Sequence, residues 1–77
     1  MNWKFSDHVE LQLSERNIST QSVQDALEAP DEVVKGKRER LIYHKFIDKK
    51  LMRVVTEGDL IITVYLTSKI SKYYEGQ

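Results

Sequence analysis

The sequence predicts an α+β fold in which two N-terminal helices pack on one face of an antiparallel, roughly four-stranded meander sheet. Apolar residues recur at helical spacing up to Pro30, whereas apolar and polar residues alternate beyond it. Two short polar stretches, "DKK" and "EGD", interrupt the alternating part and are typical of hairpin turns. Helices followed by such strands form one helical layer on one sheet, and a chain of 77 residues is expected to form one domain over residues 1–77.

The first helix is expected to begin at Ser6 or Asp7, whose side-chain oxygens can accept hydrogen bonds from the free N–H groups of a first turn. Phe5, Val9 and Leu13 follow at i, i+4 spacing and form its apolar side. His8 falls in the first turn, where the partial positive charge of a helix N-terminus disfavours a protonated imidazole. The position of His8 is therefore either incidental or functional.

The second helix is expected to begin after Ser19, which suits the N-cap position. Ile18 precedes this residue and can pack on Val23 as a hydrophobic staple. Val23 and the Ala-Leu pair at 26–27 form the stripe that is expected to be buried, and Pro30 ends the helix.

Four strands are expected after Pro30, over 31–36, 38–47, 51–56 and 59–67, and the tail is interpreted as a turn or a short helix. In the last strand every second residue is aliphatic, which predicts that this set faces the helices: Leu60, Ile62, Val64 and Leu66. The other set is then expected on the face of the sheet that points away from the two helices, called the outer face below: Ile61, Thr63 and Tyr65.

The length of the turn before the last strand decides on which face of the sheet each side chain of the third strand lies. A three-residue turn over 57–59 places Arg53 on the outer face, whereas a two-residue turn places it among the aliphatic side chains, at a high desolvation cost. The three-residue turn is therefore expected. It pairs Val54 with Ile62 and Met52 with Val64.

The turn at 48–50 decides which residue of the second strand lies opposite Arg53. A turn of odd length places Lys45 there, and a turn of even length places His44 there. Two cations repel each other, whereas a neutral imidazole avoids the repulsion. The sequence therefore favours an outer face shared by His44, Arg53, Thr63 and Tyr65.

The net charge of zero is unevenly distributed. The segment from Lys35 to Arg53 contains eight lysines and arginines and two acidic residues, a net charge of +6 that the remainder balances. Such a segment is typical of binding to nucleic acid or another anion, or of long charged side chains that protect exposed strands. With no cysteine and two histidines, no metal or cofactor is expected. Since no long apolar run is present, the sequence predicts a cytoplasmic protein without a signal peptide or a membrane span.

His44, Arg53 and Tyr65 on an accessible face supply the groups that metal-independent RNA cleavage needs. Arginine binds phosphate bidentately, and histidine or tyrosine exchanges protons with the ribose 2′-hydroxyl or the leaving 5′-oxygen. The basic side chains expected to hold the RNA backbone are Lys37, Arg38, Arg40 and Lys45. The structural alternative is that His44 and Tyr65 are ordinary strand residues and that the stem of Arg53 shields the sheet.

The order of several motifs resembles that of a widespread prokaryotic family of small domains of unknown function. A histidine is followed by Glu-Arg-x-Ile-Ser in "HVELQLSERNIS", a second helix ends in proline, and "LMRVV" and "IITVY" come later. The resemblance spans about Phe5 to Tyr65. That family is similar, more distantly, to the RelE and ParE superfamily of toxins, whose fold packs two N-terminal helices on an antiparallel sheet.

The resemblance draws attention to His8, Arg16, Arg53 and Tyr65, so the candidate catalytic residues become Arg53, Tyr65, His44 and His8. It implies a toxin-like domain that cleaves messenger RNA, in solution or on the ribosome, and that an antitoxin protein neutralises. Gln12 departs from the pattern, because family members often carry a basic residue one turn after the histidine.

The hypothesis from the sequence is thus a metal-independent endoribonuclease of a toxin-antitoxin module. The alternative is a non-catalytic protein-interaction module of the same fold. In either case the open edges of a meander sheet predict a homodimer or a complex with an acidic or amphipathic peptide.

Overall fold

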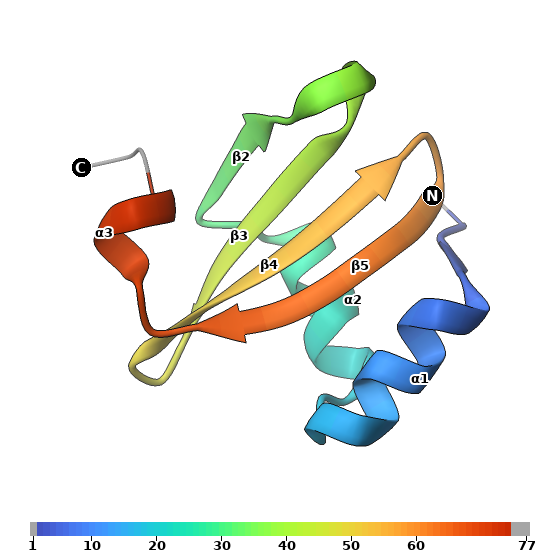
Figure 1. Ribbon diagram of the computed structural model, residues 1–77, viewed down its shortest axis with the longest axis horizontal. Helices are drawn as coiled ribbons and strands as arrows, with labels where there is room; N and C mark the ends of the chain where they lie inside the picture. Colours follow the sequence, from blue (N-terminus) through green and yellow to red (C-terminus); the bar gives the residue numbers. More distant parts are fainter. Residues whose placement is uncertain (1, 75–77) are drawn as a thin grey trace.

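A computed structural model describes residues 2–74 of the chain, which form the expected α+β fold (Figure 1). In this part of the chain, helices α1 (Asp7–Arg16) and α2 (Thr20–Glu28) pack on one face of a five-stranded, mostly antiparallel sheet. The strands are β1 (Lys4–Phe5), β2 (Glu32–Lys35), β3 (Leu41–Ile47), β4 (Lys50–Glu57) and β5 (Leu60–Thr67), in the order β1-β5-β4-β3-β2. A 3₁₀ turn, η1 (Lys37–Glu39), joins β2 to β3, and a one-turn helix, α3 (Ile70–Tyr73), follows β5.

Both N-terminal helices begin where the capping residues predict. The Ser6 hydroxyl accepts a hydrogen bond from the Val9 N–H at 3.1 Å, and the Ser19 hydroxyl accepts one from the Ser22 N–H at 3.0 Å. Between the helices Asn17 adopts a left-handed conformation with φ of 54°, which its short polar side chain tolerates. Helix α2 ends at Glu28, two residues before Pro30.

The hydrophobic core lies between the two helices and the inner face of the sheet. Its buried members are Val9, Leu13, Ile18, Val23, Ala26, Leu27, Met52, Val54, Ile61 and Val64. Trp3 and Phe5 close one side of it, and the Trp3 ring meets that of Tyr43 edge to face, with 5.8 Å between the ring centroids. The predicted staple between Ile18 and Val23 falls inside this core.

The hairpin between β3 and β4 has the even turn that the charges favour. Ile47 pairs with Lys50, so the turn consists of Asp48 and Lys49, and His44 lies directly opposite Arg53. Asp48 has a positive φ of 57°, as the first residue of a two-residue turn needs. The parity argument from charge repulsion is confirmed.

The hairpin between β4 and β5 differs from the expected three-residue turn. Glu57 pairs with Leu60, so Gly58 and Asp59 form a two-residue turn, with the positive φ of 62° that suits glycine at Gly58. Beyond the turn, a bulge between Val55 and Thr56 shifts the register.

Because of this bulge, most side chains of β5 lie on the expected face of the sheet, but those of its first residues do not. The predicted pairs of Val54 with Ile62 and Met52 with Val64 are wrong, because Val54 pairs with Val64 and Met52 with Leu66. Ile61 lies in the core instead of on the outer face, and Leu60 is exposed instead of facing the helices. Arg53 nevertheless keeps its outer position, opposite Tyr65.

One edge of the sheet is covered by segments that precede α2. Strand β1, which the alternation of apolar residues did not predict, pairs in parallel with Leu60 and Ile61 of β5. Further along β5, the backbone of Val64 is bonded by two side chains of α1 that lie one turn apart. The Gln12 carbonyl oxygen accepts from the Val64 N–H at 3.0 Å, and the Arg16 guanidinium donates to the Val64 carbonyl at 2.8 Å. Gln12 and Arg16 together thus take the place of a neighbouring strand at this point of the edge.

Candidate functional site

Three of the candidate catalytic residues lie side by side across three neighbouring strands. His44 of β3 is directly opposite Arg53 of β4, which is directly opposite Tyr65 of β5. All three point to the outer face, because the residues next to them in β4 and β5, Met52, Val54 and Val64, belong to the core on the other face.

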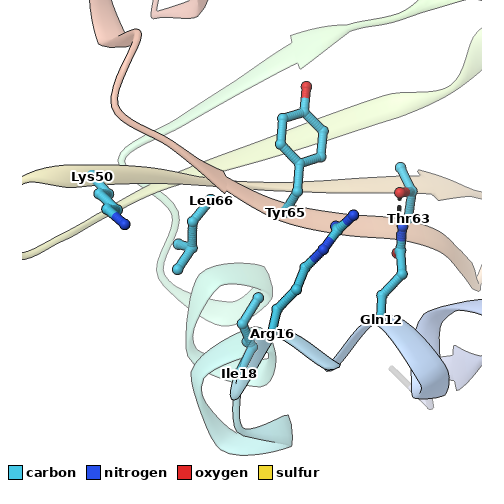
Figure 2. A pocket seen from close by; sticks show the side chains of 7 residues that line it. All are labelled: Gln12, Arg16, Ile18, Lys50, Thr63, Tyr65 and Leu66. Carbon is cyan, nitrogen blue, oxygen red and sulfur yellow. Dashed lines mark hydrogen bonds between the residues drawn. The ribbon is translucent and has the colours of Figure 1, made fainter. Parts of the chain in front are cut away.

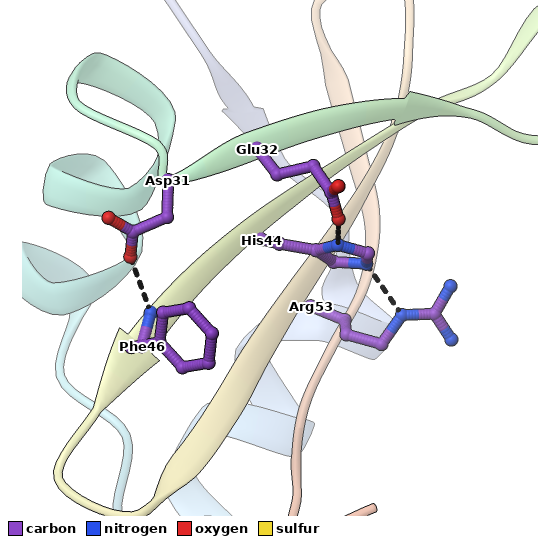
Figure 3. Close-up of polar contacts among 5 residues, drawn as sticks. All are labelled: Asp31, Glu32, His44, Phe46 and Arg53. Atoms are coloured by element: carbon purple, nitrogen blue, oxygen red, sulfur yellow. Dashed lines mark hydrogen bonds and ion pairs between the residues drawn. The ribbon is translucent and has the colours of Figure 1, made fainter. Parts of the chain in front are cut away.

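Strand β2 adds Glu32 to this row, opposite His44. The start of β2 is held against β3 by Asp31, whose N–H donates to the His44 carbonyl at 2.8 Å and whose carboxylate accepts from the Phe46 N–H at 2.8 Å. Figure 3 shows the result: the Glu32 carboxylate lies 2.8 Å from Nδ1 of His44, and the Arg53 Nε lies 3.1 Å from Nε2 of the same ring.

The contacts of His44 assign its tautomer. A guanidinium only donates hydrogen bonds, so Nε2 of His44 accepts from Arg53 and carries no proton. Nδ1 therefore carries the proton and donates it to Glu32. The His44 side chain is fully buried and that of Glu32 is 12% exposed. Since both ring nitrogens are bonded within the protein, His44 orients the guanidinium of Arg53.

Arg53 is fixed on three sides. Besides its bond to His44, its Nη1 donates a hydrogen bond to the Tyr65 hydroxyl. The ring of Tyr73 from α3 lies over the guanidinium, with 4.0 Å between its carbon and the ring centroid, a cation–π geometry. Of the five N–H groups of Arg53, three are left for a ligand among the hydrogen bonds of residues 2–74. An arginine held in this way presents a preorganised fork to an anion.

Helix α3 lies over the outer face and covers much of this row. Tyr74, just after it, has its ring centroid 4.8 Å from that of Phe46 and 6.5 Å from that of His44. Tyr73 meets Tyr65 edge to face at 6.4 Å. Residues 70–74, which the sequence left as a turn or a short helix, therefore complete the site with aromatic rings.

The phenol of Tyr73 lies among cations. The ammonium of Lys72, whose nitrogen lies 5.3 Å from the ring centroid, is the largest influence and lowers the pKa of Tyr73 below its ordinary value of 10.0. Partial desolvation opposes this shift, while a hydrogen bond with Tyr65 and the charge of Arg53 support it. The Tyr73 hydroxyl therefore gives up its proton more readily than that of an isolated tyrosine.

Replacing Lys72 with glutamine is expected to raise the pKa of Tyr73 toward 10.0, because the largest stabiliser of the phenolate is removed. The tyrosine side-chain carbon signals in an NMR titration measure this pKa directly. Lys69→Gln is the matched control, and it should leave the Tyr73 titration unchanged. A lowered pKa adds stability only above the unfolded-state value and loses it as the pH falls through the folded-state value, so stability at neutral pH should be unchanged. An unaltered titration in Lys72→Gln would refute the assignment.

His8 and Arg16 lie away from the row of polar residues that occupies the outer face. Both belong to α1, which packs on the inner face through Val9 and Leu13. The His8 side chain is exposed in the first turn. Arg16 bonds the edge of β5, as does Gln12, the residue at which the sequence departs from the pattern that it resembles. The departure at Gln12 thus has a structural role.

The four candidate RNA-binding residues lie in different places. Lys37 and Arg38 are exposed in the η1 turn, where Arg38 has a positive φ of 59°. Arg40 forms an ion pair with Glu57 at 3.2 Å. The Lys45 ammonium donates to the Ala29 carbonyl at the end of α2, at 2.8 Å, on the inner side of the sheet. Of these four residues, Lys37 and Arg38 are the two that are exposed, in the turn between β2 and β3.

Sequence reasoning missed Glu32 and Tyr73 as parts of the site. Glu32 was assigned to a strand, but its partner depends on the length of the loop to β3, which contains two residues with positive φ, Arg38 and Glu39. Tyr73 lies in the tail, for which the sequence predicts only a turn or a short helix. Its neighbour Lys72 was the available signal, because a lysine next to a tyrosine favours the phenolate.

Two other findings bear on the class of site. Within residues 2–74, no three His, Asp or Glu side chains gather closely enough to hold a metal ion. In the same residues, no helix is long and apolar enough to cross a membrane.

Comparison with known proteins identifies a family. A search of curated proteins and a search of solved structures found no match. A family model described as "Domain of unknown function (DUF4258)" matches residues 5–66, which include both N-terminal helices and the strands that carry Glu32, His44, Arg53 and Tyr65. The chain therefore belongs to the DUF4258 family of domains of unknown function.

Proposed function

We propose that this domain is a toxin-like, metal-independent endoribonuclease that binds messenger RNA on the outer face of its sheet. The observation that carries the proposal is the fixed guanidinium of Arg53, held by His44 and Tyr65 and stacked under Tyr73. An arginine whose remaining N–H groups point to a ligand is suited to a phosphodiester. The family that the sequence motifs resemble is itself similar, more distantly, to toxins of the RelE and ParE type, and this similarity suggested the substrate.

Each residue of the row has a role in the proposed reaction. The 2′-hydroxyl of a ribose loses its proton to the phenolate of Tyr73, and its oxygen bonds to the adjacent phosphorus. Arg53 stabilises the charge that develops on the phosphate oxygens. The bond from phosphorus to the 5′-oxygen breaks, and the hydroxyl of Tyr65 supplies a proton to that oxygen. The products are a 2′,3′-cyclic phosphate and a 5′-hydroxyl, and no redox change occurs.

His44 and His8 differ in this proposal. Both nitrogens of His44 are occupied, so it acts as a positioning residue that connects Glu32 to Arg53. His8 extends from α1, on the side of the sheet opposite Arg53, and receives no proton transfer in this mechanism. Lys37 and Arg38, which are exposed, are the basic residues best placed to hold the RNA backbone beside the hairpin.

The test is cleavage of a defined messenger RNA by the purified protein in the presence of EDTA, with free RNA and with ribosome-bound RNA as separate arms. We expect fragments that end in a 2′,3′-cyclic phosphate in at least one arm, and growth arrest when the chain is expressed from a tightly controlled promoter. Intact RNA in both arms, together with normal growth, would overturn the proposal.

A second candidate function is a protein-interaction module, and the cover over Arg53 favours it. The ring of Tyr73 stacks on the guanidinium and Tyr74 lies beside His44, so aromatic side chains already contact the row. A stable cluster of this kind also stiffens the outer face. In this function the neighbouring protein, an antitoxin or a second copy, is the ligand, and the row of polar residues is structural.

The open edge of β2 is the site where we expect such a partner. Strand β2 ends the sheet and meets no further strand in the described part of the chain, and Val33 on it is 44% exposed. An extended peptide can add there through backbone hydrogen bonds. Val33→Lys should prevent this addition, because a charge at the edge opposes strand pairing. Light scattering measures the mass of the complex formed by the chain alone and by the chain mixed with the protein encoded by the neighbouring reading frame. Leu11→Lys, which changes an exposed residue of α1, is the control. A monomer in every sample would remove the idea.

A further inference from the structure

A pocket at the edge of β5 is lined by one residue of the proposed reaction, Tyr65, and otherwise by residues that have no part in it. Its volume is about 530 Å³, and it lies where α1 and the end of β5 meet (Figure 2). The residues that line it are Gln12, Arg16, Ile18, Lys50, Thr63, Tyr65 and Leu66. The hydroxyl of Tyr65 points away from Arg16 (Figure 2), and Gln12 and Arg16 bond the edge of β5 that faces away from β4, the strand of Arg53.

The polar groups that the pocket offers are mostly hydrogen-bond donors. Arg16 uses one N–H on the Val64 carbonyl, at 2.8 Å, and keeps the others. The Gln12 carbonyl oxygen accepts from both Val64 N–H and the Thr63 hydroxyl, at 3.0 and 3.1 Å, so the NH₂ group of Gln12 is left to donate. Lys50 adds an exposed ammonium, and none of the lining residues is acidic. Such a set of donors selects an anion.

The side chains of the pocket are anchored on β5, and the pocket lies close to the site around Arg53. Arg16 and Gln12 are both anchored on Val64, which immediately precedes Tyr65, the residue paired with Arg53. Arg53 lies on β4, the strand next to β5, so one strand spacing, about 5 Å, separates its backbone from that of the strand whose free edge borders the pocket. A short stretch of single-stranded RNA covers this distance.

We propose that the pocket is a second phosphate subsite, which binds a neighbouring phosphate of the RNA strand whose scissile phosphodiester lies at Arg53. Lys50 and Arg16 contact the phosphate, and Ile18 and Leu66 provide an apolar wall for the attached nucleoside. The subsite rests on the proposed function and adds the path of the bound RNA to it. An RNA strand that reaches both sites passes over the edge of β5 beside Tyr65.

The experiment measures binding of single-stranded oligonucleotides with 2′-O-methyl riboses, which lack the attacking hydroxyl and are not cleaved. Lys50→Gln is the test variant, because the Lys50 side chain is exposed and the change leaves the backbone pairing with Ile47 in place. Lys49→Gln is the matched control, because Lys49 is the adjacent residue, in the turn before β4 and outside the pocket. Arg53→Ala reports on the first site. Dissociation constants are measured over a range of salt concentrations, with a dinucleotide, a longer strand and a free nucleoside 5′-monophosphate as ligands.

For the longer strand, Lys50→Gln should weaken binding about tenfold, the effect of one hydrogen bond to a charged group. The slope of log K against log salt should decrease by about 0.7 in magnitude, as for one phosphate contact on a single strand. The dinucleotide, with its single phosphodiester at Arg53, should bind Lys50→Gln as it binds the wild type. Lys49→Gln should behave as the wild type throughout.

Other outcomes separate this subsite from the proposed function. If the wild type binds the longer strand and Arg53→Ala does not, while Lys50→Gln equals Lys49→Gln, the subsite is overturned and the proposed function stands. If the nucleoside monophosphate binds with the same dependence on Lys50 in the Arg53→Ala background, the pocket serves a free nucleotide and the strand assignment is overturned. If the wild type binds no strand, both proposals fail.

Discussion

Arg53→Ala is expected to lower RNA cleavage per folded molecule by about a thousandfold or more, because it removes the group that stabilises charge on the phosphate oxygens in the proposed reaction. It should also cost stability, since the buried Nε2 of His44 loses its donor at 3.1 Å. An unsatisfied buried acceptor costs about 1 to 3 kcal/mol. Cleavage rates at saturating RNA, divided by the folded fraction from circular dichroism, separate the two effects.

Val54→Ala is the matched control for stability. Val54 is the next residue in β4, is fully buried on the inner face, and its truncation should cost about 1 to 3 kcal/mol through lost burial. Cleavage per folded molecule should remain that of the wild type. If both variants lose cleavage in the same proportion as folded protein, Arg53 is structural and the catalytic proposal loses its central residue.

His44→Ala is expected to have the largest effect on folding, about 3 kcal/mol, which for a domain of this size lowers the melting temperature by about 12 to 24 °C. The side chain is fully buried, so its removal leaves a cavity. It also breaks the hydrogen bonds to Glu32 and Arg53 at the same time. Urea unfolding followed by circular dichroism measures the change in free energy.

His44→Leu distinguishes the cavity from the hydrogen bonds. Leucine fills much of the volume but cannot accept from Arg53 or donate to Glu32, so we expect stability between those of His44→Ala and the wild type. Cleavage per folded molecule should fall in both variants, because Arg53 loses the contact that orients it. A His44→Leu protein as stable and as active as the wild type would show that the imidazole contributes neither stability nor orientation.

The arrangement of the fold followed from local signals in the sequence. Ser6 and Ser19 marked the helix starts because their side chains satisfy free N–H groups. The even turn at Asp48 and Lys49 followed from the repulsion that an odd turn would impose on Arg53. The bulge beside Val55 could not be predicted in the same way, because one inserted residue changes register without altering the alternation of apolar side chains.

The site was predictable where strand pairing decided it. Parity placed His44 opposite Arg53 and put Tyr65 on the same face of the sheet. The expected three-residue turn would set Thr63 opposite Arg53, and the bulge in the second hairpin brings Tyr65 there instead. Tyr73 depends on the path of the chain after β5, for which no periodic pattern exists in so short a tail. Gln12 looked like a simple departure from the pattern, since nothing in a helical pattern shows that a side chain bonds the edge of a distant strand, 52 positions along the chain.

The two α1 side chains that bond Val64 also limit how copies of this domain can assemble. A sheet with two free edges can add neighbours on both sides and grow without end into a fibre. Here β1 covers the start of β5, and Gln12 with Arg16 covers its middle, so in the described part of the chain β2 offers the long free edge. Edge-to-edge association through β2 uses up that edge in both copies. An association of this kind would therefore stop at a closed pair, and an increase in protein concentration would favour dimers over polymers.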